Sequence, residues 1–518
     1  MNWKKYREFF AGNKISEDHF VLGIDMGAAT SAISYFDPVR RVAEVLDISG
    51  GYGKASAPTA LQYIADTGEW IFGEYAILNV DGGDYHVLLT DFAAKLGSGE
   101  YADIVDSARS LVDIAAIYLT ELIANCRNIN PKAQVVGIVA TVPDFAGAAA
   151  KAAMLAAYRT AGFDRVLIDL LPEREAIFAH YFHDKGAMED ERLLLLDFGA
   201  RGLRGGIYDV AGGKRHVKCL CATMDENLST AAVDAAIYNL LAGYYCKNRK
   251  MPMDKLSKTE HQQLYTFTHQ HKDMILGHGD GKSPLKLYYN FAYPPFSVTV
   301  PRGDVDRILR AHGQKMEDFV RDLASKASCQ LEDIDAIICT GGGFEMPWAK
   351  KRVAPTLFPK EKLQTHFKNA KTVLAQGATY AAAGRLGLLP QIRFNIEDVH
   401  KIPWDVGIQV GGANGGKYRF LPILERDFPL WQKPRTAYVI LQGGAPEIGI
   451  YKRDAQGIAA KVGVARLSGF PPRPPGTTKV SVDIAAKTAG HCVVTIKDLG
   501  FGEIFPSSGI SEEIEVRI

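Results

Sequence analysis

The distribution of apolar and polar residues predicts two similar strand–turn–strand units. Four consecutive leucines, Leu193–Leu196, end at Asp197 and are followed by a glycine-rich turn and a second apolar stretch. The same order occurs at Phe20–Phe36, where an apolar run ends at Asp25 and the turn contains Gly27. This pattern is typical of a buried strand that carries an acid to the sheet edge, before a turn in which glycine allows close backbone approach. We therefore expect two similar halves that face each other across a cleft.

A third glycine element lies further along the chain. The apolar run Ala336–Thr340 leads into Gly341, Gly342 and Gly343, and Pro347 follows near a predicted helix start. Backbone N–H groups in glycine turns point at anions, and an aspartate can hold a metal ion or its water shell. The three elements together are therefore suited to bind a polyphosphate.

The pattern changes near residue 404, where short alternating strands separated by glycine and proline turns begin. Thr436–Leu441 and Lys479–Ile484 are examples. A stretch of about 115 residues with this pattern predicts an all-β sandwich. We expect an N-terminal arm at 1–19, an α/β domain at 20–388, a linker at 389–403 and a β-sandwich at 404–518.

Composition narrows the function classes. A chain of 518 residues is too long for a single core and predicts two or more domains. The net charge of +1 gives no reason to expect a nucleic-acid or membrane partner. Because no apolar run is long enough to span a bilayer and the start lacks the apolar core of a signal peptide, we expect a cytoplasmic protein. The seven cysteines show neither metal-ligand nor disulfide spacing.

In this order and spacing, the three glycine elements resemble the two phosphate motifs and the adenosine motif of the actin, hexokinase and heat-shock chaperone ATPases. The segment 135–145 and the later pieces 405–412, 467–476 and 493–496 are similar to the seventy-kilodalton heat-shock (DnaK-like) chaperones. The resemblance covers nearly everything from Phe20 to Ile518. It implies an α/β actin-like ATPase fold, with two lobes built on duplicated mixed sheets, followed by a substrate-binding β-sandwich. Because the chain stops at Ile518, we expect a member without the helical lid.

The resemblance also implies site residues, with ATP or ADP and Mg²⁺ as the cofactors. Asp25, Lys95 and Asp197 would be catalytic, and the two aspartates would hold the metal through water; a plain surface position is the alternative for Lys95. The implied nucleotide contacts are Gly27, Ala28, Ala29, Gly199, Ala200, Arg201, Gly202, Lys272, Gly341, Gly342, Gly343 and Glu345. The implied peptide contacts are Ile408, Val410, Thr436 and Tyr438, for which a place in the sandwich core is an equal alternative.

Several positions depart from the family pattern. Ala28 and Ala29 stand where the family has hydroxyl residues, and Gly202 and Arg204 stand where it has a hydroxyl and an acid. Glu345 replaces a basic residue at the adenine. Each lost phosphate contact costs about 1–3 kcal/mol, so together these changes weaken nucleotide binding strongly. Arg201 could pair with a phosphate or fill the phosphate pocket.

Three functional hypotheses follow. The first is a heat-shock-chaperone-like protein with a degenerate nucleotide site, which hydrolyses ATP weakly or not at all and binds a peptide or a protein partner through its β-domain. The second is an active ATP-dependent chaperone that binds unfolded chains and cochaperones. The third is a small-molecule kinase, which is disfavoured because a kinase has no need for a peptide-binding sandwich.

Overall fold

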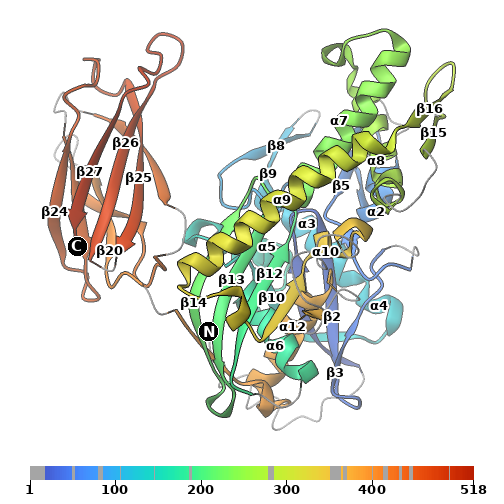
Figure 1. The fold of residues 1–518 in the computed structure, drawn as a ribbon, viewed down its shortest axis with the longest axis horizontal. Coiled ribbons are helices and arrows are strands. Elements are labelled where there is room, and N and C mark those ends of the chain that lie inside the picture. Colours follow the sequence, from blue (N-terminus) through green and yellow to red (C-terminus); the bar gives the residue numbers. More distant parts are fainter. Residues whose placement is uncertain are drawn as a thin grey trace. The chain divides into compact units, whose positions relative to one another are not determined.

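The computed structural model describes residues 18–518 except 50–52, 80–85, 105–106, 145, 186–188, 278–284, 350–362, 366–369, 399–400, 412–417, 431–433, 443–446 and 489. The chain forms two compact units (Figure 1). The larger comprises Met1–Val217 and Met224–Ile396, and the smaller comprises Lys218–Thr223 and Glu397–Ile518. The boundary at residue 396 falls inside the predicted linker. The predicted N-terminal arm lies almost wholly outside the described residues.

The first large sheet of the larger unit has the order β11-β10-β1-β2-β3, with β4 paired to β2. β1 runs parallel to β10 and antiparallel to β2, and β10 runs parallel to β11, so the sheet is mixed. Its strands are β1 (His19–Met26), β2 (Thr30–Asp37), β3 (Val42–Val45), β4 (Ala57–Pro58), β10 (Gln134–Val142) and β11 (Leu167–Pro172).

The second large sheet repeats this arrangement, in the order β18-β17-β12-β13-β14-β19. β12 runs antiparallel to β13 and parallel to β17. Its strands are β12 (Glu191–Phe198), β13 (Leu203–Ala211), β14 (His216–Asp225), β17 (Ala336–Thr340), β18 (Leu363–Thr365) and β19 (Asn395–Asp398). The expectation of two mixed sheets, each with an apolar strand–turn–strand hairpin, is confirmed.

Helices surround the two sheets, and α9 is the long helix that crosses the middle of Figure 1. Serine N-caps define two helix starts, because the Ser110 and Ser229 hydroxyls accept hydrogen bonds from the N–H groups of Asp113 and Ala232, both at 3.1 Å. Among the described residues, the helices longer than one turn are α2 (Gly73–Leu78), α3 (Leu111–Ala124), α5 (Ala148–Thr160), α6 (Glu173–Lys185), α7 (Thr230–Arg249), α8 (Lys258–Gly277), α9 (Arg302–Lys326) and α12 (Val373–Leu386); α4 (Cys126–Ile129) and α10 (Gly342–Glu345) are single turns.

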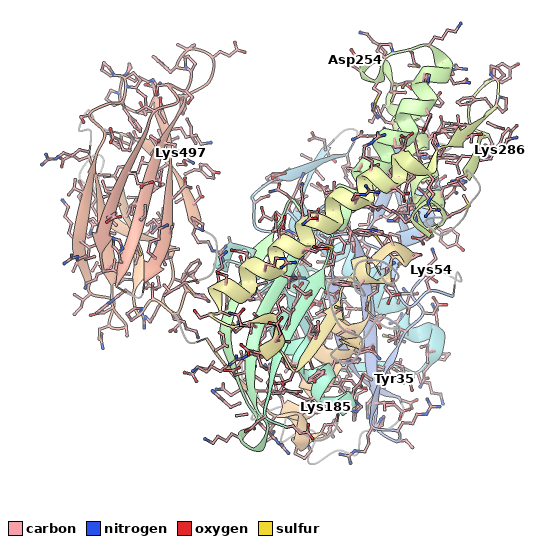
Figure 2. All side chains as sticks on the ribbon, in the orientation of Figure 1. Tyr35, Lys54, Lys185, Asp254, Lys286 and Lys497 are labelled. Carbon is pink, nitrogen blue, oxygen red and sulfur yellow. The ribbon has the colours of Figure 1, made fainter. Side chains whose placement is uncertain are left out.

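Three small antiparallel sheets complete the part of the larger unit that the structure describes. They pair β6 (Glu69–Phe72), β5 (Leu61–Ile64) and β7 (His86–Leu89), then β8 (Tyr101–Ile104) with β9 (Ser107–Ser110), and β15 (Leu285–Tyr289) with β16 (Phe296–Val300). Charged side chains such as Lys54, Asp254 and Lys286 lie exposed at the periphery (Figure 2).

The last residues of the larger unit are anchored by an aromatic cluster. The ring of Phe394 packs against Phe178 and Phe182 of α6, with ring centroids 6.4 and 5.2 Å apart. The next residue, Asn395, donates its N–H to the carbonyl oxygen of Arg215 at 3.0 Å. The predicted linker therefore begins as an ordered segment packed on the larger unit.

The smaller unit is an antiparallel sandwich, as expected from the alternating pattern after residue 404. One sheet has the order β21-β20-β23-β24, with β20 (Asp405–Gly411), β21 (Tyr418–Leu424), β23 (Glu447–Arg453) and β24 (Ala459–Arg466). The other has the order β22-β25-β26-β27, with β22 (Arg435–Leu441), β25 (Thr478–Thr488), β26 (His491–Gly500) and β27 (Ser511–Arg517). Both sheets contribute buried aliphatic side chains to one core.

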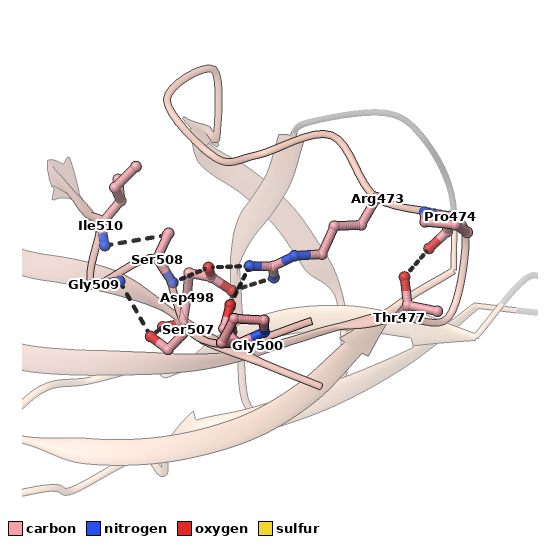
Figure 3. A network of polar contacts seen from close by, with 10 residues as sticks. Arg473, Pro474, Thr477, Asp498, Gly500, Ser507, Ser508, Gly509 and Ile510 are labelled. Carbon is pink, nitrogen blue, oxygen red and sulfur yellow. Dashed lines mark hydrogen bonds and ion pairs between the residues drawn. The ribbon is translucent and has the colours of Figure 1, made fainter. Parts of the chain in front are cut away.

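A buried ion pair ties the loop that carries Arg473 to the end of β26 (Figure 3). The guanidinium of Arg473 donates to both carboxylate oxygens of Asp498 at 2.7 and 2.8 Å. The backbone N–H groups of Gly500 and Ser508 donate to the same carboxylate at 2.9 and 2.8 Å. The Asp498 side chain is fully buried, and these four hydrogen bonds compensate for its desolvation.

Candidate functional site

The two large hairpins place Asp25 and Asp197 in one buried region of the larger unit. Asp25 stands near the end of β1 and Asp197 near the end of β12, and both are buried. The two carboxylates interact electrostatically, because the charge of Asp25 contributes to the raised pKa of Asp197. The predicted meeting of the two hairpins is therefore present in the structure.

The turn after Asp25 is held by Thr59. The hydroxyl of Thr59 donates a hydrogen bond to the carbonyl oxygen of Gly27 at 2.7 Å. The backbone N–H of Thr59 donates to the carbonyl oxygen of Ala29 at 2.9 Å. A Cβ on Gly27 would lie 2.6 Å from the carbonyl oxygen of Thr30, so the turn has no space for a larger residue. Ala28 is half-buried and Ala29 is exposed. Neither side chain carries a hydrogen-bonding group.

The turn after Asp197 is closed by a hydrogen bond from the N–H of Gly199 to the carbonyl oxygen of Gly202 at 3.0 Å. Gly202 is buried, and a Cβ there would lie 2.6 Å from the carbonyl oxygen of Asp225. Ala200 is half-buried and Arg201 is exposed. Arg201 therefore does not fill a pocket.

The glycine triplet packs directly on the end of β12. Gly341 has a φ of +88°, and a Cβ there would lie 2.3 Å from Oδ1 of Asp197. A Cβ on Gly343 would lie 2.1 Å from the ring of Phe198. Glycine is required at Gly341 both by its backbone conformation and by this close approach. The third glycine element thus reaches the same region as the two hairpins.

Arg204 occupies the centre of this region. It is the direct cross-strand partner of Asp197 in the β12–β13 hairpin. Its guanidinium contacts the carboxylate of Asp197 and, through its other terminal nitrogen, the carboxylate of Glu173 at the start of α6. The side chains of Glu173 and Asp197 are 8% and 3% exposed, so both ion pairs are shielded from water. Glu173, which directly follows Pro172 at the end of β11, is therefore part of the site.

Two further polar groups complete the cluster. The hydroxyl of Thr141, on β10, donates to Oδ1 of Asp25 at 2.7 Å. Asp144 accepts a hydrogen bond from the backbone N–H of Arg174 at 3.2 Å, and the Nε of Arg174 lies 3.7 Å from the same oxygen. The region thus holds four carboxylates, those of Asp25, Asp144, Glu173 and Asp197, and two guanidinium groups, those of Arg174 and Arg204.

Burial dominates the electrostatics of the two aspartates. Burial raises the pKa of Asp25 from 3.8 to about 6, although the Thr141 hydrogen bond and the charge of Arg204 oppose this change. Burial, together with the charges of Asp25 and Asp144, raises the pKa of Asp197 to about 7. Burial likewise lowers the pKa of Arg204. The cluster therefore changes its protonation state close to neutral pH.

Lys95 makes its ion pairs outside this cluster. Its ammonium lies 3.0 Å from Asp91 and 3.5 Å from Glu100, and its side chain is 46% exposed. The ionic partners of Lys95 in the described part of the chain are therefore surface carboxylates and not Asp25 or Asp197. This placement is the surface alternative that the sequence left open.

The two remaining implied nucleotide contacts have partners within the protein. Lys272 lies 2.9 Å from a carboxylate oxygen of Asp234. Glu345 accepts a hydrogen bond from the backbone N–H of Ala370 at 2.7 Å, which fixes the segment that follows the glycine triplet. The next residue, Lys371, lies over Gly342, since a Cβ on that glycine would be 3.4 Å from Cε of Lys371.

The implied peptide contacts do not converge on one surface. Ile408 is 2% exposed and belongs to the sandwich core, and Val410 packs partly against that core. Thr436 and Tyr438 are exposed and lie on the outer side of β22, whose inward side chains include Ala437 and Val439. The core alternative that the sequence left open therefore holds for Ile408, whereas Thr436 and Tyr438 lie at the surface.

Known chaperones are similar to this chain over almost its whole length. The Chaperone protein DnaK of Thermosipho melanesiensis is 27% identical over 512 residues, which cover 94% of this chain and 80% of the relative. The Thermosipho africanus protein of the same name is 26% identical over 512 residues, covering 94% and 79%. That of Thermotoga maritima is 24% identical over 506 residues, covering 93% and 79%. The chain is a distant homologue of the DnaK chaperones over almost its whole length.

The smaller unit of this DnaK-like protein has a second match. Residues 401–518 match a family described as a domain of unknown function, DUF8552. The match covers the whole sandwich.

Sequence reasoning missed several members of the DnaK-like site. It noted Arg204 only as the replacement of an acid, and it did not include Thr141, Asp144 or Arg174. The signal was available, because Thr141 and Asp144 flank the end of β10, a strand parallel to β1, and parallel strands present their carboxyl ends at one edge. Among the described residues, no group of three or more His, Cys, Asp or Glu side chains is arranged to hold a metal ion. In the same part of the chain, no helix is long and apolar enough to cross a membrane.

Proposed function

We propose that this DnaK-like protein has a degenerate nucleotide site, with weak or no ATP hydrolysis, and that it binds a peptide or a protein partner through its β-sandwich in the cytoplasm. The observation that carries the proposal is the position of Arg204. Its guanidinium contacts the carboxylates of Asp197 and Glu173 inside the region where the two hairpins meet. The family resemblance implies Mg²⁺ and the phosphates of ATP at this place.

The residues present do not fit a magnesium–triphosphate. Mg²⁺ requires carboxylate oxygens and water in near-octahedral geometry, and catalysis of phosphoryl transfer depends on the metal to neutralise phosphate charge. Here the oxygens of Asp197 and Glu173 already face a guanidinium. A metal ion would have to lie beside this buried positive charge, which costs Coulomb energy in a region of low dielectric constant. Ala28 and Ala29 add no phosphate ligand of their own.

The alternative is an active ATP-dependent chaperone, served by the cochaperones that the family implies. One observation supports it: Gly27, Gly202 and Gly341 leave no space for a Cβ, so both hairpin turns and the glycine triplet require glycine, as close backbone approach to a ligand also would. The β-sandwich supports partner binding under either proposal, and it gives a small-molecule kinase the least support. The homology to the DnaK chaperones is independent of this choice.

Isothermal titration calorimetry of the full chain with Mg-ATP and with Mg-ADP tests the proposal, together with a phosphate-release assay on the same batch. We expect no binding heat at millimolar nucleotide and no turnover above the rate of the buffer. Micromolar binding accompanied by phosphate release would reject the degenerate site and establish the active chaperone. Micromolar binding without turnover would reject the expected loss of nucleotide binding. The protein would then be one that binds nucleotide without hydrolysing it.

A further inference from the structure

Three arginines from separate parts of the larger unit gather around the chain that follows α12. Arg41 directly precedes β3, Arg215 directly precedes β14, and Arg393 follows the helical turn Pro390–Ile392. Each guanidinium donates a hydrogen bond to a backbone carbonyl oxygen in the segment 384–390. The acceptors are Leu388 for Arg41 at 2.6 Å, Pro390 for Arg215 at 3.0 Å and Gly384 for Arg393 at 3.0 Å. The three cations therefore surround one short piece of backbone.

These contacts stabilise the end of α12, but they use only part of each side chain. Carbonyl groups at the C-terminal end of a helix lack partners within the helix and carry partial negative charge, so cationic side chains stabilise them. One hydrogen bond from each guanidinium meets this need. A guanidinium has five N–H donors, so most donors of the three arginines remain for other acceptors.

No carboxylate neutralises these three arginines within the described residues. Arg40, the neighbour of Arg41, pairs with Glu44 at 2.7 Å. Arg41, Arg215 and Arg393 form no such ion pair in the described part of the chain, and all three are exposed. We call these three residues the arginine surface. Its positive charge is thus open to a ligand from outside.

Two of these arginines also stand at unfavourable backbone positions. The φ angle is +61° at Arg41 and +50° at Arg215. A positive φ is uncommon for residues other than glycine, because the Cβ comes too close to a neighbouring carbonyl oxygen. Glycine would form either turn without this cost. The turns themselves therefore do not explain why both positions carry arginine.

We propose that the arginine surface is a docking site for an acidic segment of a partner protein, whose carboxylates pair with the remaining guanidinium N–H groups. Arginine suits this ligand because its planar fork can donate two parallel hydrogen bonds to one carboxylate. The proposal assigns an interaction surface to the larger unit. It depends neither on the nucleotide site nor on the β-sandwich, so its failure and that of the proposed function are distinguishable.

Charge and size favour an acidic protein segment over a nucleic acid. Three guanidinium groups offer few phosphate contacts, whereas nucleic-acid affinity is built from many, on the order of 6–10 in strongly salt-dependent complexes. The net charge of the chain is +1, so the chain provides no wider basic field to attract a polyanion. A short segment with two or three carboxylates matches the charge of the arginine surface.

The arginine surface includes the start of the linker. Arg393 directly precedes Phe394, whose ring packs on α6. The N–H of Asn395 donates to the carbonyl oxygen of Arg215 at 3.0 Å. A partner that bridges Arg215 and Arg393 would therefore keep the linker start in its packed position.

Fluorescence anisotropy with the full chain tests the proposal. The probe is a labelled nine-residue peptide that alternates glutamate and serine, and a second probe has glutamine in place of glutamate. The test variants are Arg215→Gln and Arg393→Gln, which each remove one charge. Arg40→Gln is the matched control, because it removes one charge beside Arg41 from a side chain that already has an acidic partner.

We expect each test variant to bind the acidic probe at least about tenfold more weakly than the wild type, through loss of charge-assisted hydrogen bonds. Arg40→Gln should stay within about twofold of the wild type, as for an exposed ion pair of small effect. The glutamine probe should not bind. Saturating acidic probe should slow the proteolytic cleavage of the wild type after residue 390.

Equal weakening by Arg40→Gln would show that binding follows overall charge and would overturn the arginine surface. Absence of acidic-probe binding by the wild type would overturn it as well. A labelled single-stranded DNA of nine nucleotides is a third probe, and tighter binding of this DNA with the same response to the variants would make a nucleic acid the occupant. Thermal unfolding checks that each variant is folded, and Arg41→Gln replaces a test variant that is not.

Discussion

Arg204 faces Asp197 directly across the β12–β13 hairpin, and its guanidinium bonds to that carboxylate and to Glu173. A buried guanidinium between two carboxylates leaves each acid with a cationic partner. Removal of one member of such a buried group leaves uncompensated charge, which is more damaging than the loss of a surface ion pair. The cluster is therefore a sensitive target for substitution.

The first prediction concerns Arg204→Gln. This variant leaves Asp197 and Glu173 without their guanidinium, and we expect the free energy of unfolding to fall by about 3–5 kcal/mol. Urea unfolding at pH 7.5 measures the change. Arg201→Gln is the control, since Arg201 is exposed in the adjoining turn and should alter stability by less than about 0.5 kcal/mol.

The second prediction uses the same variant with Mg²⁺. If Arg204 occupies the place of a metal ion, millimolar MgCl₂ should raise the melting temperature of Arg204→Gln and leave that of the wild type unchanged, because a ligand stabilises only the state that binds it. Equal changes in the melting temperatures of the two proteins on addition of MgCl₂ would show that Arg204 does not occupy the place of a metal ion. Calorimetry with MgCl₂ alone gives an independent measure of the gained affinity.

The third prediction concerns pH. Folding raises the pKa of Asp25 to about 6 and that of Asp197 to about 7. Between about pH 4 and 7 these two carboxylates therefore bind more protons in the folded protein than in the unfolded chain. Stability contributed by these groups therefore falls as pH rises through this range. Asp25→Asn removes one charge and retains an oxygen for Thr141, so we expect it to raise stability at pH 8 by about 2 kcal/mol and to have a smaller effect at pH 4.5. Asp91→Asn, at an exposed position, should show no such pH dependence.

The fourth prediction concerns the sandwich, where the pH dependence of stability has the opposite sign. Burial alone would raise the pKa of Asp498, but the hydrogen bonds from Arg473 and Ser508 outweigh it and hold the pKa well below its usual range. The stability contributed by this carboxylate is thus present at neutral pH and is lost as the pH falls through acid values. Asp498→Asn should cost about 3–5 kcal/mol at pH 7. Lys497→Met, at a neighbouring exposed position, should cost less than about 0.5 kcal/mol; a similar loss for both would argue against a special role of the ion pair.

The fifth prediction concerns the start of the linker. Phe394→Ala removes the ring that packs on Phe178 and Phe182, and for a half-buried phenylalanine we expect a loss of about 1–3 kcal/mol. Limited proteolysis should cut the segment after residue 390 faster in this variant. Phe501→Ala, which shortens a phenylalanine that is 43% exposed in the sandwich, should leave this cleavage rate unchanged.

The sequence predicts much of the fold, because its two hairpins and its change of pattern near residue 404 have strong local signals. The Arg204–Asp197 pair was also within reach, since a four-residue turn from Gly199 to Gly202 fixes which strand residues face each other. The contribution of Glu173 could not be predicted from the sequence, because it depends on how α6 packs against the second sheet. The choice between surface and core for Thr436 and Tyr438 could not be made from the sequence either, because Ala437 to Leu441 are all apolar and alternation does not distinguish the two faces of the strand. The domain limits and the roles of Lys95 and Lys272 stay predictions.

The Arg204 side chain has a consequence for signalling as well as for stability. A cation attached to the chain is present beside Asp197 and Glu173 in every molecule, at an effective concentration that does not vary with the surroundings. A diffusing metal–nucleotide complex would have to displace this tethered competitor before it could enter. Under the proposed degenerate site, the larger unit would therefore not respond to the ATP concentration of the cell, and binding at the sandwich would depend on the supply of its partner alone.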